Sequence, residues 1–243
     1  MTDDLLPELP AGAFNKQDAG DDRAFYAPSR LVTHIDAGAI AALTGFYRAA
    51  LPNGGRVLDL MLSWISHLPD DIEYTQIVGH GMNPDELATN PRLNRWFVQD
   101  LNREPMLPLD EGTFDAALCC VGAQYLQRPV AVFAEVRRVL VAGAPFVVSF
   151  SNRCFPTKAV AIWRALDTNG HAALVRLYLQ RAGSAEVAFE VLADGSASDS
   201  HRGNWPRLID GISCPSQPIV GHLRDKPCLF TSAVRSPRCS CRN

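Results

Sequence analysis

Short apolar runs alternate with segments of helical periodicity along most of this chain. Turn-forming residues bound most of the runs, which predicts strands at residues 57–60, 74–79, 95–98, 114–119, 144–150, 185–192 and 228–234. Apolar residues at helical spacing predict helices over 35–51, 129–140, 156–166 and 172–181, and Asn83-Pro84 is typical of a further helix start. Because continuous apolar runs indicate strands buried on both faces, the pattern predicts an α/β fold. We expect a doubly wound, mostly parallel seven-stranded sheet whose last strand is antiparallel.

The two ends of the chain lack this pattern. Residues 1–28 mix Pro, Gly, Asp and Asn without a period, so we expect an irregular N-terminal arm. Residues 29–235 are expected to form one domain, in which residues 194–222, rich in Ser, Gly, Asp and Pro, make a long loop. Residues 236–243 are expected to be a disordered tail.

Composition and charge narrow the class of protein. With 243 residues, of which 47% are hydrophobic, the chain can bury one sizeable core. A net charge of -3 offers no electrostatic footprint for nucleic acid or an anionic membrane. The N-terminus lacks a basic, apolar-cored signal peptide and no apolar run could span a bilayer, so we expect a cytoplasmic protein. The seven cysteines have no zinc-ligand spacing, so no metal site is predicted.

The predicted sheet indicates where chemistry should occur, because ligands of open α/β sheets bind beyond the carboxyl ends of the strands. Four places meet that rule: the turns after Leu60 and Gly79, the segment around Asp100 and the segment after Leu118. The first turn is unusual, since residues 61–64, Met-Leu-Ser-Trp, stand where a nucleotide-binding strand normally delivers glycines. Glycine is used there because it lacks Cβ and tolerates positive φ. We therefore expect the large ring of Trp64 to lie in the cleft.

Several segments, taken in order, carry a resemblance to a known family. Val57-Leu58-Asp59-Leu60 is followed by Val78-Gly79-His80-Gly81-Met82-Asn83-Pro84-Asp85-Glu86-Leu87, by Phe97-Val98-Gln99-Asp100, and by residues 107–115 and 133–140. From about Gly55 to Leu192 the chain resembles the class I S-adenosylmethionine-dependent methyltransferases of the type 11-like group. The resemblance implies a Rossmann-like methyltransferase fold, S-adenosyl-L-methionine as cofactor, and methyl transfer to a small molecule.

The resemblance also implies roles for individual residues. Cofactor contacts are implied for Asp59, Gly79, Asp100, Leu101 and Cys119, and substrate contacts for Gln124 and Tyr125. Asp59 would hold the amino-acid end of the cofactor and Asp100 the adenine amino group, with Leu101 beside the ring. Each has a purely structural alternative: Asp59 as a cap of the following turn, Asp100 as a turn residue and Cys119 as a small buried hydrophobe. The catalytic residues are unknown.

Three side chains are candidates for a general base: His67, His80 and Tyr125. His67 has an alternative role as a loop residue that forms a structural hydrogen bond.

The chain departs from the family at three places, one of which is residues 142–144, Ala-Gly-Ala, in place of a Gly-Gly pair. An acidic residue normally ends the second strand and accepts hydrogen bonds from both ribose hydroxyls. Here His80-Gly81 stands at that place, so Asn83 or Asp85 would have to reach the ribose. In addition, the side chains of residues 61, 62 and 64 would crowd the space of the methionine moiety.

These departures keep a second hypothesis open, a non-catalytic scaffold or binding protein of the same fold that has lost cofactor binding. A dinucleotide-dependent oxidoreductase is disfavoured, because neither G-x-G-x-x-G nor an acidic end to the second strand is present.

Overall fold

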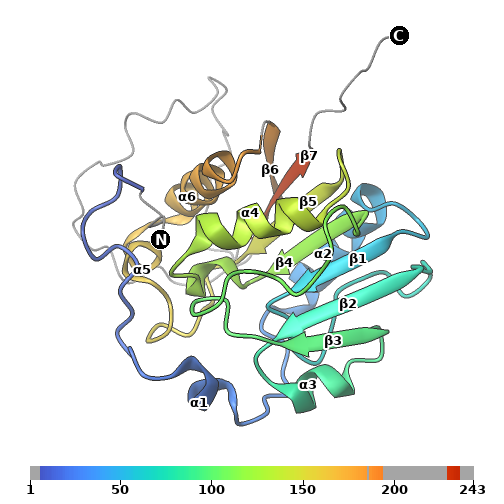
Figure 1. Ribbon diagram of the computed structural model, residues 1–243, viewed down its shortest axis with the longest axis horizontal. Helices are drawn as coiled ribbons and strands as arrows, with labels where there is room; N and C mark the ends of the chain where they lie inside the picture. The colour runs from blue at the N-terminus through green and yellow to red at the C-terminus, as the bar shows by residue number, and fades with distance from the viewer. Residues whose placement is uncertain (1–5, 185, 194–228, 236–243) are drawn as a thin grey trace.

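The structure, a computed structural model, describes residues 6–184, 186–193 and 229–235 (Figure 1). Its sheet has seven strands in the order β3-β2-β1-β4-β5-β7-β6. The strands are β1 (Arg56–Leu60), β2 (Gln76–Gly81), β3 (Arg95–Val98), β4 (Ala116–Cys120), β5 (Pro145–Phe150), β6 (Glu186–Ala193) and β7 (Leu229–Arg235). The first five pair in parallel, whereas β7 is antiparallel to both β5 and β6. The predicted doubly wound, mostly parallel sheet is confirmed.

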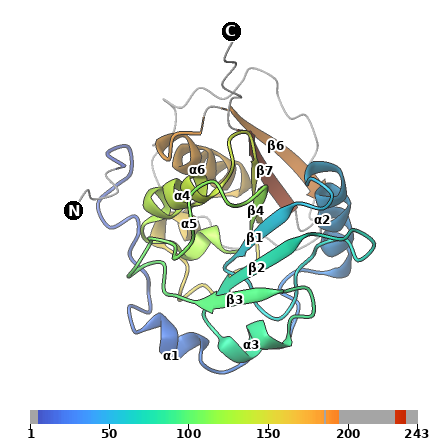
Figure 2. The ribbon, with the colours of Figure 1, turned by 45° about the vertical axis from the view of Figure 1, so that its right-hand side comes forward.

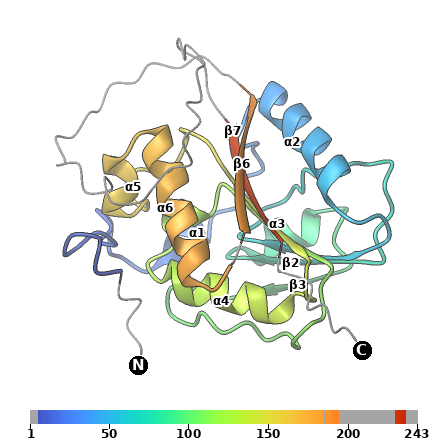
Figure 3. The same ribbon diagram turned by 90° about the horizontal axis from the view of Figure 1, so that it is seen from above.

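Helices cover both faces of this sheet (Figure 3). They are α1 (Asp22–Tyr26), α2 (Ala37–Ala50), α3 (Pro84–Thr89), α4 (Pro129–Val139), α5 (Ala161–Ala165) and α6 (Thr168–Arg181), with a short 3-10 helix at Ala123–Tyr125. Successive strand residues point to opposite faces. Leu58 therefore packs in the core formed by α4 and α6, and Val57 packs in the core formed by α2.

Several predicted elements differ in their bounds, most clearly two helices and the strands β2 and β4. β2 runs from Gln76 to Gly81 rather than from Tyr74 to Gly79. α5 begins only at Ala161, because the main-chain N–H groups of Val160 and Ala161 donate to the carbonyls of Gln124 and Asn15 instead of to a preceding helical turn. α6 begins at Thr168, where the Asp167 carboxylate accepts a hydrogen bond from the N–H of Gly170 and caps the helix. β4 begins at Ala116 rather than at Phe114, which is buried in the core.

The N-terminal arm, defined here as residues 6–34, is attached to the body along its length. It contains α1, which the sequence pattern did not predict. The fully buried Lys158 holds it through ion pairs of 3.0 Å with both Asp18 and Asp22. Its path brings α1 to the carboxyl-end side of β2 and β3 (Figures 1 and 2).

The predicted loop at 194–222 and the predicted tail at 236–243 lie outside the described residues. Among the helices that are described, none combines the length and apolarity that a bilayer crossing requires.

Candidate functional site

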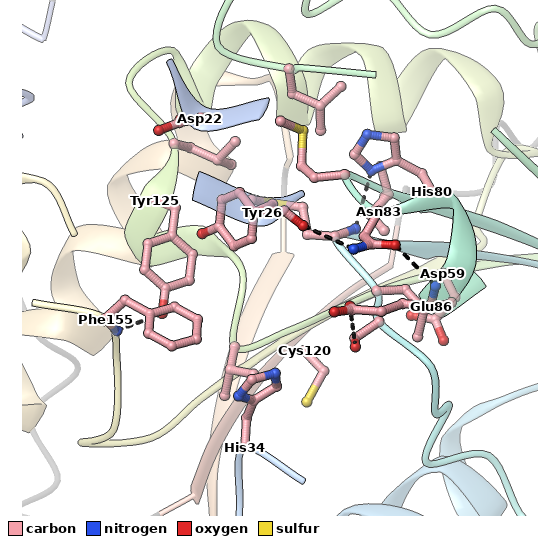
Figure 4. A pocket seen from close by; sticks show the side chains of 18 of the residues that line it. Asp22, Tyr26, His34, Asp59, His80, Asn83, Glu86, Cys120, Tyr125 and Phe155 are labelled. Atoms are coloured by element: carbon pink, nitrogen blue, oxygen red, sulfur yellow. Dashed lines mark hydrogen bonds between the residues drawn. The ribbon is translucent and has the colours of Figure 1, made fainter. Parts of the chain in front are cut away.

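A pocket lies beyond the carboxyl ends of β1, β2, β4 and β5 (Figure 4). One wall comes from the segments that follow these strands and from the Asp100–Asn102 segment after β3. The opposite wall includes Asp22, Tyr26, Arg30 and His34 of the N-terminal arm. The site is therefore built between the sheet and the arm, at the place where the sheet rule puts ligands.

Four of the seven predicted site residues line this pocket: Asp59, Asp100, Leu101 and Tyr125. Gly79, Cys119 and Gln124 do not. Cys119 faces the α4 core, so the next residue of the strand, Cys120, lines the pocket in its place. A Cβ on Gly79 would lie 2.5 Å from Leu93 Cδ1, so that residue faces packed side chains. Gln124 is fully buried beside the pocket.

Asp59 combines a pocket position with a structural hydrogen bond. Its carboxylate accepts a hydrogen bond of 2.8 Å from Ser66 Oγ, which fixes the segment that follows β1. Burial raises the pKa of Asp59 to about 7, although the Ser66 hydrogen bond opposes the shift. Because half of such carboxyls are protonated near neutral pH, the charge of this group is sensitive to anything that binds beside it.

Asp100 also has a local partner. It is buried, its Oδ1 accepts a hydrogen bond of 3.0 Å from the N–H of Asn102, and Arg103 lies 3.7 Å from its Oδ2. The adjacent Leu101 is buried and provides an apolar surface in the pocket. The turn role and the pocket position therefore coexist in Asp100.

The bulky residues of the turn after β1 face two glycines, Gly81 at the end of β2 and Gly122 after β4. Met61 has φ of 56°, a conformation that favours glycine, and Met61 Cβ would lie 2.8 Å from a Cβ on Gly122. A Cβ on Gly81 would overlap the main-chain oxygen of Leu62. The bulky side chains that crowd the first turn are thus accommodated because the facing residues carry none.

The contact between Leu62 and Gly81 explains why no acidic side chain can stand at the end of β2. Any side chain at Gly81, an acidic one included, would overlap Leu62.

Val121, after β4, has φ of 45°, which is a strained conformation for a β-branched residue. Met61 and Val121 both line the pocket, as strained residues at functional sites often do.

Trp64 does not lie in the pocket, contrary to the expectation from its place in the sequence. Its Nε1 donates a hydrogen bond of 3.1 Å to the carbonyl of Val32 in the arm, while its neighbours Ser63 and Ile65 line the pocket. The ring is turned away because the segment pairs with β2, where the N–H of Leu62 donates to the carbonyl of His80.

The two histidines that are candidates for a general base differ in their hydrogen bonds. Both ring nitrogens of His80 have partners: the N–H of Met61 donates to Nδ1, and Nε2 lies 2.9 Å from the carbonyl of Gln99. A neutral ring that donates from Nε2 satisfies both contacts. Burial lowers the pKa of His80 to about 4, although the Gln99 contact opposes the shift. His80 therefore holds the turn and has no free nitrogen for a substrate.

His67 is different, because its buried Nδ1 has no hydrogen-bond partner within the part of the chain that the structure describes. The residue lines the pocket. Burial, and then the nearby His34, lower the pKa of His67 to about 4, so the ring is neutral at physiological pH. A neutral imidazole with an unused nitrogen can accept a proton.

The arm and the segment after β5 supply an aromatic wall that the sequence pattern did not indicate. Phe155 is at its centre, with ring centroids 5.6 Å from His34, 6.3 Å from Tyr26 and 6.1 Å from Tyr125. The N–H of Phe155 also donates to the Tyr125 hydroxyl at 2.9 Å. Tyr125 was predicted to contact the substrate, whereas Tyr26, His34 and Phe155 were not predicted, and only their meeting in space reveals them (Figure 4).

Comparison with known proteins agrees with this geometry. Residues 72–148 match a family model described as a methyltransferase domain. No curated protein matches the chain significantly.

Solved structures give the same fold at low sequence identity. A chain of the Haloferax volcanii complex between the Trm112 methyltransferase activator and a putative methyltransferase is 16% identical, with a TM-score of 0.52, and the match covers 84% of this chain and 96% of that one. A SAM-dependent methyltransferase from Archaeoglobus fulgidus is 11% identical, with a TM-score of 0.54 and coverage of 81% and 94%. A possible histamine N-methyltransferase from Thermotoga maritima is 15% identical, with a TM-score of 0.51 and coverage of 82% and 88%. The family-model match over residues 72–148 and the strand order therefore agree on a methyltransferase-like fold for this chain.

Proposed function

We propose that this protein transfers a methyl group from S-adenosylmethionine to a small molecule in the pocket described above. The observation that carries the proposal is the meeting of two different walls in one pocket. Asp59, Asp100 and Leu101 stand at the strand ends, and the aromatic wall of the arm faces them. A pocket enclosed by the chain's own N-terminal arm favours a small compound over a polymer.

The residues at both ends of the pocket fit the cofactor. The buried carboxylate of Asp100 can accept a hydrogen bond from the adenine amino group, and Leu101 can cover the ring. Asp59 lies at the other end, where its carboxyl can approach the amino group of the methionine moiety. When bound, the cofactor supplies an electrophilic methyl group on a sulfonium. The strand-end position for a ribose acceptor is closed, because Leu62 fills the space beside Gly81.

The chain's own contribution to the reaction is alignment and exclusion of water. Tyr26, Tyr125 and Phe155 offer ring faces and edges against which a substrate can be held. We propose His67 as the acceptor of the proton that a hydroxyl or ammonium group gives up so that its oxygen or nitrogen can attack the methyl group, because Nδ1 has no hydrogen-bond partner among the described residues. The cytoplasmic location and the absence of a nucleic-acid partner stay predictions.

One observation favours the alternative, a scaffold of the same fold. Met61 and Leu62 occupy space that glycines leave open in a cofactor-binding turn. If that space is needed by the methionine moiety, the pocket binds another compound or none.

Calorimetric titration of the protein with S-adenosylmethionine and S-adenosylhomocysteine tests the proposal. We expect saturable binding of both at micromolar concentrations, together with a rise in Tm. Absence of heat and of any Tm change at millimolar ligand would overturn the methyltransferase function and leave the scaffold.

A further inference from the structure

Glu86 is a carboxylate in the pocket to which no role has yet been assigned. It lies in the first turn of α3, is only 8% exposed, and lines the pocket beside His80 and Asn83 (Figure 4). None of the ion pairs among the described residues includes it. A buried carboxylate without a cationic partner is costly unless hydrogen bonds satisfy it.

Within the described part of the chain, the hydrogen bonds of Glu86 use half of its acceptor capacity. Oε1 accepts from the N–H of Arg30 and Oε2 accepts from Ser63 Oγ, both at 2.6 Å. A carboxylate offers about four lone-pair positions, so each oxygen can accept one more hydrogen bond. Two free positions on adjacent oxygens of one carboxylate match the two hydroxyls of a vicinal diol.

The position of Glu86 agrees with such a ligand. Its contact with Ser63 places the carboxylate at the segment that follows β1, and its helix begins directly beyond β2. Glu86 therefore lies near the end of β1, which carries Asp59 (Figure 4), and in the helix that follows the closed end of β2 at Gly81.

Asn83 and Asp85, which the sequence suggested as ribose ligands, do not suit that role in the structure. Asn83 Oδ1 accepts from the N–H groups of Asp85 and Glu86, and its Nδ2 donates to the carbonyls of Tyr26 and Ala27. Asp85 is exposed and does not line the pocket. Glu86 is the carboxylate of α3 that reaches the pocket.

We propose that Glu86 accepts hydrogen bonds from the ribose hydroxyls of the cofactor, in place of the acidic residue that ends the second strand in the family. The inference rests on the proposed function, because it assumes an adenosine ligand. It also links ligand and arm, since the same carboxylate holds the N–H of Arg30. The acceptor for the ribose hydroxyls would then stand in α3 instead of at the end of β2, where Leu62 leaves no room for a side chain at Gly81.

The test is a calorimetric comparison of two ligands, S-adenosylhomocysteine and its 2′,3′-dideoxy analogue, with three proteins. These are the wild type, Glu86→Gln, and the control Asp85→Asn, which changes an exposed acid in the same helical turn. We expect Glu86→Gln to weaken the binding of S-adenosylhomocysteine about tenfold or more, because it removes charge-assisted hydrogen bonds. The dideoxy analogue should bind wild type and Glu86→Gln equally, and Asp85→Asn should match the wild type for both ligands.

The possible failures are distinguishable. If Glu86→Gln keeps wild-type affinity, or loses both ligands to the same extent, Glu86 has a structural role and the inference is overturned. If the wild type binds neither ligand, the proposed function fails first and the inference falls with it. Melting temperatures establish that each variant is folded. Should Glu86→Gln not fold, Glu86→Asp retains the charge but withdraws it by one methylene, and it should lose the preference for the ribose ligand.

Discussion

The main-chain N–H of Met61 donates to Nδ1 of His80 across two neighbouring strand ends, at 3.2 Å. This hydrogen bond holds Met61 in its left-handed conformation, and it holds His80 in a neutral form because Nδ1 must accept. A turn that glycines normally form is here stabilised by a buried histidine. The relationship makes the first turn a pH-sensitive element.

Acid should therefore destabilise the protein through His80. Its pKa is about 4 in the folded state against about 6.5 when unfolded, so the unfolded chain binds more protons between these values. Stability should fall as the pH decreases from 6.5 to 4, by about 3 kcal/mol for this residue. Urea unfolding of the wild type and His80→Gln at pH 7 and pH 4.5 measures it. His67 contributes similarly in both proteins, so equal losses in the two would contradict the assignment.

Asp59 should show the opposite dependence. Burial raises its pKa to about 7 from an unfolded value of 3.8, so the folded state binds the extra proton between these values. The stability that this provides is complete below pH 3.8 and is lost as the pH rises to 7. Asp59→Asn should gain stability relative to the wild type with rising pH, on the order of 4 kcal/mol by pH 8. A constant difference between pH 4 and pH 8 in thermal unfolding would show that the carboxyl ionises normally.

The packing of Leu62 against Gly81 can be tested with a single methyl group. Gly81→Ala forces Cβ onto the main-chain oxygen of Leu62 and should destabilise the fold by about 1 to 3 kcal/mol. The control is Gly45→Ala in α2, where a Cβ meets no atom of the described residues within 4 Å and should stabilise the helix by up to about 1 kcal/mol. Denaturant titration of both variants gives the comparison. Similar effects of the two substitutions would mean that the Gly81 site is open.

Asp100 should contribute to cofactor binding more than to stability. Asp100→Ala removes one hydrogen bond to the N–H of Asn102, which is worth about 1 kcal/mol, while binding of S-adenosylhomocysteine should weaken about tenfold. The exposed Asp110→Ala is the matched control for loss of one negative charge. Calorimetry and thermal unfolding separate the two effects. Unchanged affinity in Asp100→Ala would leave this carboxylate as a turn residue only.

Phe155 should determine how firmly the arm is attached. Its ring contacts Phe25, Tyr26 and His34 of the arm and Tyr125 of the body. Phe155→Ala should increase amide hydrogen exchange in residues 20–34, because each aromatic pair contributes about 0.5 to 1.5 kcal/mol. Phe189→Ala, at an aromatic ring of β6 that Arg176 covers, is a control that should leave exchange in the arm unchanged. Wild-type exchange in the arm of Phe155→Ala would show that Lys158 and its ion pairs suffice to hold it.

Local pattern was enough to predict the sheet and the edge at which the pocket lies. Apolar runs at Val57 and Val147 must be buried on both faces, and burial of that kind requires helices on each side. The run at residues 57–60 contains Asp59 and the run at residues 95–98 is followed by Asp100, so the sequence also placed two acidic residues at the pocket. These features are determined locally, because a few consecutive residues are enough to indicate that a strand is buried and where it ends.

Tertiary structure alone decided which side chains meet there. Whether Cys119 or Cys120 faces the pocket depends on the register of β4 in the sheet, and a shift of one residue reverses it. The closure of Gly81 by Leu62, the position of Glu86 and the aromatic wall around Phe155 depend on contacts between segments far apart in the chain. Such contacts leave no period or spacing in the sequence, because packing selects them by shape after the strands and helices have formed.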